Sequence, residues 1–332
     1  MRPTSMRLGT RNPRRSKVSR QTVRREASLR FKDIIDRARA VARRKRPRIA
    51  VAGAHDEIVL EVVCDARARG LVSPLLFGDA GRIAEIAKRK RLALEGCEVV
   101  DVADAKLAAR QAVEAARSGG AEILMKGIVT TATLMKAVLD EETGIKAQGL
   151  MSHVALIEPK SRGRVYLMSD GGIVIDPDLV QKVGIVKNAI GVAHALGLSL
   201  PRVALVSSIE TVNLKMKSAV DAAIISKMAD RGEIRGAVVD GPLALDNAVS
   251  SEAAKQKGIS SPVAGRADIL IVGHADVGNV MYKALTYFCG DQVKTAGVIV
   301  GGRVPMVVVS RADTYEARFN SIAVACVLAA GR

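Results

Sequence analysis

The sequence has 332 residues, of which 48% are apolar and 26% charged, with a formal net charge of +17. This is the composition of a globular chain that can bury a large core and is long enough for two domains. No run of eighteen apolar residues occurs, and the N-terminus lacks the apolar core of a secretory signal, which argues against a membrane span and against export. We therefore expect a cytoplasmic protein with no membrane partner.

The positive charge is concentrated at the N-terminus. The first 48 residues hold 18 Lys and Arg and three acids, so the other 284 residues have a balance of only +2. A nearly neutral body argues against a groove for nucleic acid. Residues 1–27 lack periodicity, and we expect them to form a disordered basic tail. A solubilising role is favoured over a specific nucleic-acid arm, and a transit peptide is a third alternative.

The cysteines and histidines show no metal-binding spacing. There is no C-x-x-C pair, and no two histidines are four positions apart. We therefore expect neither a zinc site nor a disulfide framework, but reduced cysteines in apolar surroundings. The residues concerned are Cys64, Cys97, Cys289, Cys326, His55, His153, His194 and His274.

From residue 28 onward, amphipathic segments alternate with short apolar runs. A helix over 31–42 ends before Pro47, and a strand over 48–53 follows. This alternation favours βαβ units and a parallel sheet covered on both faces. The pattern predicts further helices at about 55–70, 81–91, 104–118 and 131–140, and strands at 75–78, 98–101 and 121–125.

The rhythm changes near residue 148, where two apolar runs at 154–157 and 165–168 flank a turn typical of a hairpin. Alternation then resumes, so we predict an α/β fold with a disordered tail at 1–27. Domain I is predicted at 28–147 plus 303–332, and domain II at 148–302. The elements predicted after the hairpin are helices at 177–197, 215–230, 246–257 and 276–289 and strands at 203–206, 237–240, 269–272 and 298–300.

The chain closes with a change from strand to helix. Three valines at 307–309 predict a buried strand, and apolar residues from 316 to 327 recur at helical spacing. The turn between them, Ser310 to Asp313, presents backbone N–H groups and the permanently charged fork of Arg311, a combination suited to phosphate or carboxylate. We predict that it is the anion end of an active site. An interdomain ion pair is the alternative for Arg311.

Glycines, hydroxyls and isolated charges follow the other predicted strands, where ligands of parallel sheets bind. Each candidate has a plainer alternative: Lys126 as a solvated strand end, Thr130 as a helix cap, and Lys283 on a solvated face. No Walker or dinucleotide-binding glycine motif follows the first strand, which argues against a nucleotidase and a dehydrogenase. The candidate binding residues are Lys126, Thr130, Thr131, Ser169, Asp170, Asn279 and Lys283.

Over nearly all of residues 30–330 the sequence resembles the phosphate acetyl/butyryltransferase family, and the butyryl branch most closely. The resemblance implies two three-layer α/β/α domains of the isocitrate/isopropylmalate dehydrogenase-like type, with a cleft between them and a homodimeric assembly. It also implies the reaction of acyl-CoA with phosphate to give acyl phosphate and CoA, without a metal or prosthetic group. The segments that carry it are 49–54, 126–131, 168–171, 240–246, 261–265, 278–283, 310–313 and 320–322.

The resemblance also assigns roles. It places Ser310 and Arg311 at the phosphoryl group and the developing oxyanion, and Asn279, Tyr282 and Lys283 in the same cleft. The acetyl branch has a catalytic aspartate seven positions after the serine, where this sequence has alanine. The nearest carboxylates that remain as candidates for a general base are Asp313 and Glu316.

The chemistry limits how much such a base contributes. A CoA thiol with a pKa of about 8.5 is a few per cent ionised at neutral pH, so forming the thiolate costs roughly 2 kcal/mol. Positioning and oxyanion stabilisation should supply the larger share. We expect direct transfer in a ternary complex, since no Cys–His pattern supports an acyl-enzyme. The alternatives are an acyl-carrier-protein-dependent phosphate acyltransferase and a non-catalytic regulatory module of the same fold.

Overall fold

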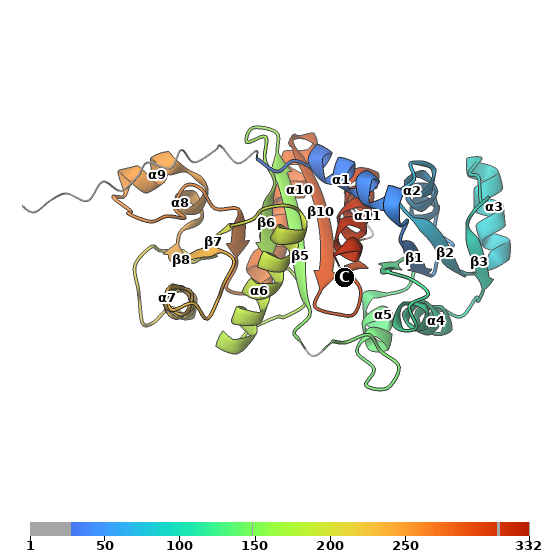
Figure 1. The fold of residues 1–332 in the computed structure, drawn as a ribbon, viewed down its shortest axis with the longest axis horizontal. Helices are drawn as coiled ribbons and strands as arrows, with labels where there is room; N and C mark the ends of the chain where they lie inside the picture. Colours follow the sequence, from blue (N-terminus) through green and yellow to red (C-terminus); the bar gives the residue numbers. More distant parts are fainter. Residues whose placement is uncertain (1–27, 148, 311–312, 332) are drawn as a thin grey trace, which may run out of the picture.

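The computed structural model describes residues 28–147, 149–310 and 313–331, and Figure 1 shows the path of the chain. The first part alternates helices and strands as the sequence predicts. Side-chain caps begin several of these helices: the carboxylates of Asp56, Asp79 and Asp104 each accept a backbone N–H from the first turn. The elements are α1 (Phe31–Arg44), β1 (Arg48–Ala52), α2 (Glu57–Ala68), β2 (Ser73–Gly78), α3 (Ala80–Lys90), β3 (Glu98–Asp101), α4 (Ala105–Arg117), β4 (Ile123–Lys126) and α5 (Thr131–Val138).

The second part opens with the predicted hairpin. Its two strands, β5 (Ser152–Pro159) and β6 (Tyr166–Ser169), pair antiparallel, which confirms that prediction. Alternation then resumes, and a final strand and helix close the chain. The remaining elements are α6 (Leu179–Ala195), β7 (Arg202–Val206), α7 (Lys217–Asp230), β8 (Val238–Leu243), α8 (Leu245–Val249), α9 (Ser251–Gln256), β9 (Ile269–Ile271), α10 (Ala275–Cys289), the 3-10 turn η1 (Gly290–Gln292), β10 (Val293–Val300), β11 (Met306–Val307) and α11 (Tyr315–Ala330).

The strands of the described residues form one sheet, in the order β3-β2-β1-β4-β11-β10-β5-β6-β9-β7-β8. Pairing is parallel from β3 to β11 and from β6 to β8, while β10 runs antiparallel to both β11 and β5. This sheet confirms the predicted α/β class. The division into domain I and domain II stays a prediction, because the sheet runs without a break through both segments.

Alternate residues of β1 face opposite sides of the sheet, as strand geometry requires. Ile49 and Val51 pack with α1, α2 and α11 in one buried cluster, whereas Ala50 and Ala52 pack with α4 and α5 in another. Helices therefore cover both faces of this half of the sheet, as Figure 1 shows.

The closing segment of the chain lies in the first half of the sheet. Strand β11 pairs with β4, and α11 contacts α1, α2 and β10. Every residue of α11 from Ala317 to Leu328 is buried. The last helix therefore completes a core that the first helices began.

Several predicted elements differ in extent from the observed ones; the strand predicted over 298–300, for example, spans Val293–Val300. Two others are interrupted. The strand predicted over 307–309 ends at Val307, and Val308 and Val309 leave the ladder to line a cavity. The helix predicted over 246–257 is divided, because Ser250 has an extended backbone and its hydroxyl accepts the N–H of Ala253 to begin α9. In both cases local hydrogen bonding or a cavity interrupts a run that hydrophobic spacing alone would continue.

Two of the four cysteines lie closer together in space than their spacing in the sequence implies. Cys64 of α2 and Cys97, just before β3, interact through their side chains, and this contact lowers the pKa of the Cys97 thiol to about 7. The same contact raises the pKa of the Cys64 thiol, and burial raises it further. All four cysteines are free thiols.

Residues 1–27, for which we predicted a disordered basic tail, lie outside the described residues. Within the ranges that the structure describes, no helix is long and apolar enough to cross a membrane. Within the same ranges, no group of three or more His, Cys, Asp or Glu side chains is placed to hold a metal ion.

We predict that truncating a buried side chain of α11 destabilises the whole fold. Ile322 is fully buried, and Ile322→Ala should lower the free energy of unfolding by about 2–5 kcal/mol, measured by chemical denaturation. The matched control is Ile175→Ala, since Ile175 is 69% exposed and its truncation should change the value by less than about 1 kcal/mol. Similar losses in both variants would show that α11 does not contribute this packing.

Candidate active site

A cavity of about 310 Å³ lies where the chain leaves β11, between the hairpin β5–β6 and helix α10. Its walls come from segments far apart in the sequence and include both apolar side chains and polar or charged ones. The lining residues are Thr131, His153, Met168, Gly171, Gly172, Ile173, Asn279, Tyr282, Lys283, Thr286, Tyr287, Gly297, Ile299, Val308, Val309, Ser310 and Asp313.

The segment from Ser310 to Asp313 is held by hydrogen bonds at both described ends. The backbone N–H of Ser310 donates to Oδ2 of Asp313 at 2.7 Å. The buried guanidinium of Arg318 donates to the carbonyl of Ser310 at 3.0 Å and to that of Asp313 at 3.3 Å. Arg318 therefore fixes the approach of this segment to the cavity.

A second turn contributes Gly171, Gly172 and Ile173. The buried carboxylate of Asp170 accepts the backbone N–H groups of Gly172, Ile173 and Val174 at 2.7–3.2 Å, which fixes the turn after β6. Helix α10 packs directly on it, because a Cβ at Gly278 would lie 2.7 Å from the carbonyl oxygen of Asp170. Glycine at 278 thus permits the close approach of helix and turn.

Helix α10 supplies the cationic side of the cavity. The amide of Asn279 donates to the carbonyl of Gly171 at 3.4 Å, which ties the helix to the turn after β6. Lys283, one turn further along, lines the cavity and remains exposed. Burial, with a smaller effect of Asp313, raises the pKa of the neighbouring Tyr282 to about 12, so this phenol stays protonated at neutral pH.

The carboxylate of Asp313 lies among several positive or donating groups. Burial raises its pKa above the ordinary aspartate value, and this is the largest effect. The N–H of Ser310 and the charges of Arg318, His153 and Lys283 act in the opposite direction. The carboxylate of Asp313 therefore lies near two cations, Arg318 and Lys283, at a cavity that apolar side chains also line.

His153 of β5 also lines the cavity, a position that its spacing in the sequence did not predict. Burial lowers the pKa of its imidazole, while Asp170 and Asp313 act to raise it. Its position within an apolar strand is the signal that was available in the sequence, but it did not reveal which way the ring faces. Arg318 was likewise missed.

The structure brings half of the predicted residues to the cavity: Thr131, Asn279, Tyr282, Lys283, Ser310 and Asp313. Arg311 lies outside the described residues. Ser169 and Asp170 lie directly beneath the wall and bond to its backbone, Ser169 through a hydroxyl that donates to the carbonyl of His153 at 2.8 Å.

Three predicted residues make other contacts. The ammonium of Lys126 donates to the carbonyls of Gly127 and Val129, so it stabilises the turn before α5. Thr130 caps α5 by accepting the N–H of Thr133, as its plainer interpretation predicted. Glu316 is exposed and pairs with Lys294 at 2.7 Å, so Asp313 is the candidate base that lines the cavity.

At position 317, where the acetyl branch has its catalytic aspartate, this chain has a buried alanine. Ala317 lies in the first turn of α11, where its N–H donates to the hydroxyl of Thr314 and its side chain is 3% exposed. The small residue is packed into the core.

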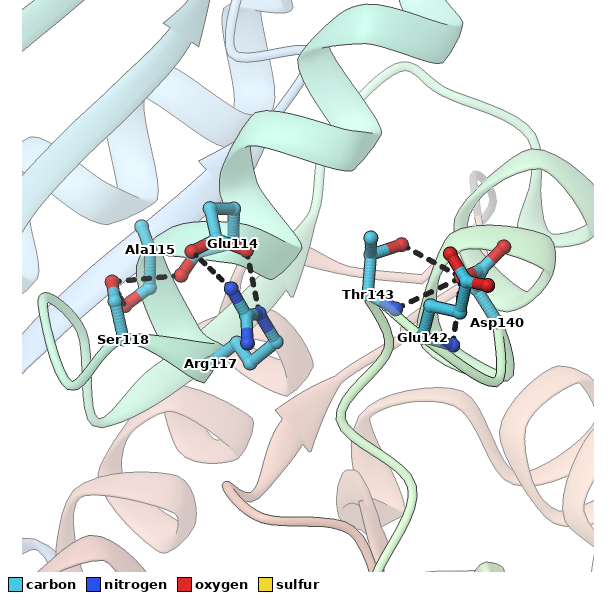
Figure 2. Close-up of polar contacts among 7 residues, drawn as sticks. All are labelled: Glu114, Ala115, Arg117, Ser118, Asp140, Glu142 and Thr143. Carbon is cyan, nitrogen blue, oxygen red and sulfur yellow. Dashed lines mark hydrogen bonds and ion pairs between the residues drawn. The ribbon is translucent and has the colours of Figure 1, made fainter.

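A second polar cavity, of about 350 Å³, lies between α4 and the turn after α5. Figure 2 shows that Asp140 accepts hydrogen bonds from Glu142 and Thr143, and that Glu114 pairs with Arg117 in the next turn of the same helix. None of the predicted site residues lines it. The cavity beside Ser310 is therefore the stronger candidate.

Comparisons with known proteins match the segments that line the cavity. The family described as "Phosphate acetyl/butaryl transferase" matches residues 105–326, a range that contains all the lining residues of the cavity. The phosphate butyryltransferase of Clostridium beijerinckii is 44% identical over 303 residues, which cover 91% of this chain and 99% of the relative. The phosphate acetyltransferase of Thermotoga maritima is 44% identical over 289 residues, which cover 87% and 97%.

A solved structure supports the same conclusion. The branched-chain phosphotransacylase from Enterococcus faecalis superposes with a TM-score of 0.75 at 35% identity, covering 85% of this chain and 99% of that one. The similarity thus extends over the α/β fold as well as over the sequence around the cavity. The chain belongs to the phosphate acetyl/butyryltransferase family.

Proposed function

We propose that this chain is an enzyme that transfers a short acyl group between CoA and inorganic phosphate, by direct transfer in a ternary complex. The observation that carries the proposal is the 44% identity to a phosphate butyryltransferase over 91% of the chain. The chemistry of the cavity supports it, because charged donors and an apolar wall meet in one place. Acyl phosphate and CoA are the products in one direction and the substrates in the other.

In this proposal the polar side of the cavity binds the phosphoryl group. Lys283 and Arg311 supply positive charge, and Ser310 and Asn279 supply hydrogen-bond donors. Such preorganised donors stabilise the oxyanion that forms when the acyl carbon becomes tetrahedral. Met168, Ile173, Ile299 and Val308 line the apolar side, which suits a short alkyl chain. The mechanism uses no metal or prosthetic group.

We also propose a homodimer in the cytoplasm. Helix α10 exposes an apolar stripe beside the cavity, formed by Val277, Val280, Tyr287 and Phe288. These positions recur at helical spacing, and Phe288 is 89% exposed. Exposed apolar patches of this kind are typical of protein interfaces, and a second copy of the chain is the partner that we propose.

The function predicts phosphate-dependent release of CoA thiol from at least one of acetyl-, propionyl-, butyryl- and isobutyryl-CoA, followed with a thiol reagent. Omitting phosphate should abolish the release, and adding a metal chelator should leave it unchanged. No phosphate-dependent release with any of these thioesters would contradict the proposed function.

We predict that Lys283→Met raises the KM for phosphate at least tenfold, because a cation that faces the anion is lost; the same assay gives the value. Lys294→Met is the matched control, since Lys294 pairs with Glu316 away from the cavity.

Arg311→Ala should lower kcat by about 10²-fold, the usual effect of losing an oxyanion-stabilising group. Full turnover by both site variants would show that the anion site has been misassigned.

For the assembly, we predict a dimer mass by light scattering for the wild-type chain and a monomer mass for Phe288→Glu, because a buried carboxylate without a partner disfavours the interface. Lys106→Glu on α4 should stay dimeric. An unchanged dimer in Phe288→Glu would place the interface elsewhere.

A further inference from the structure

The imidazole of His153 is an unusual group in this cavity. The ring is partly exposed to the cavity, but its Nδ1 atom is closed off and has no hydrogen-bond partner among the described residues. A buried polar atom without a partner costs free energy, so its presence calls for an explanation. His153 is therefore a candidate for a role in the reaction.

Two glycines of the cavity wall flank the ring. A Cβ at Gly171 would lie 3.3 Å from Nδ1, and a Cβ at Gly297 would lie 2.7 Å from Nε2. Both positions thus need glycine, because the backbone passes so close to the ring that a Cβ would crowd Nδ1 or collide with Nε2. The space beside the imidazole belongs to the same cavity as Ser310 and Asp313.

We infer that His153 is the general base and general acid of the transfer, an inference that rests on the proposed function. Asp313 is less suited to this role, because its Oδ2 already accepts the N–H of Ser310. The oxygens of Asp170 accept three backbone N–H groups, and Glu316 pairs with Lys294 outside the cavity. Among the described groups that line the cavity, His153 offers Nε2, the ring nitrogen beside Gly297, as the atom that accepts the proton, because Nδ1 is closed off.

The proton balance of the reaction fits a histidine. When hydrogenphosphate attacks the thioester, its attacking oxygen forms the C–O bond and passes its proton to the imidazole. The tetrahedral intermediate then breaks the C–S bond, and the imidazolium returns the proton to the leaving CoA thiolate. In the opposite direction the neutral imidazole takes the thiol proton as sulfur attacks the acyl phosphate, and returns it to the departing phosphate. His153 is neutral at the start and end of each turnover.

The surroundings of the ring agree with a neutral resting state. Burial lowers the pKa of His153, which keeps the imidazole unprotonated at pH 7, while Asp170 after β6 and Asp313 before α11 stabilise the imidazolium when it forms. Among the described residues, the other titratable groups that line the cavity are Tyr282, Lys283 and Tyr287 on α10, and the charge of Arg318 on α11 acts on Asp313. Proton transfer by a positioned histidine is a common contribution to catalysis.

The test is the pH dependence of thioester formation from butyryl phosphate or acetyl phosphate and CoA. Between pH 6.5 and 8.5 the wild-type kcat should be nearly flat, because the base is already neutral. In His153→Gln it should rise about tenfold per pH unit, because the reaction then depends on the thiolate, whose pKa is about 8.5. The loss should be roughly 30-fold at pH 7, the inverse of the thiolate fraction, and close to none at pH 9.

His194→Gln is the matched control. His194 lies on α6, away from the cavity, and its ring bonds to the carbonyl of Gly236, so this variant should match the wild type at every pH. The proposal is overturned if His153→Gln keeps the flat profile, or if the wild type already shows the tenfold rise. A wild-type chain that forms no thioester from either acyl phosphate would instead refute the proposed function, and this inference would fall with it.

A second variant retains the imidazole but displaces it, because a Cβ at position 297 would lie 2.7 Å from Nε2 and the ring must move. Gly297→Ala places a methyl group against Nε2, so kcat at pH 7 should fall by at least tenfold while the KM for CoA changes less than threefold. This variant decides the question if His153→Gln loses the circular dichroism spectrum of the folded protein. Wild-type kcat in a folded Gly297→Ala protein would then reject the role of His153.

Discussion

The site depends on the contact between the buried guanidinium of Arg318 and the carbonyls of Ser310 and Asp313. A buried cation is costly unless its donors are satisfied, and here they are directed at the backbone of the segment that leaves the sheet. Because α11 is buried from Ala317 to Leu328, Arg318 transmits the rigidity of the core to that segment. The position of the polar groups beside the cavity follows from this anchor.

The remaining walls depend on equally specific backbone contacts. Asp170 shapes the turn after β6 through three N–H groups, and Gly278 lets α10 lie against that turn. The hairpin contributes His153 from the neighbouring strand. The hairpin with its following turn, helix α10 and the segment before α11 thus meet around one small cavity. This is the arrangement needed to bring two substrates together at a defined distance.

Hydrophobic spacing was sufficient to predict the α/β class, the hairpin and most helices, because those features depend on local periodicity. It was not sufficient for the site. Asp313 and Glu316 are three residues apart, yet the first precedes α11 and lines the cavity whereas the second lies in the helix and faces Lys294. Their difference depends on where the helix begins. Likewise, whether His153 faces the cavity depends on strand register and on glycines in other strands, which one sequence does not reveal.

The placement of β11 and α11 has a consequence for biosynthesis. The strand next to β4 and the helix against α1 and α2 are translated well after the elements that they pair with or cover. Until they leave the ribosome, the first half of the polypeptide has an unpaired strand edge and an uncovered apolar face, both of which invite aggregation. A premature stop codon ahead of β11 would therefore damage a region encoded much earlier in the gene, and nascent chains of this enzyme should need chaperone protection until α11 has been translated.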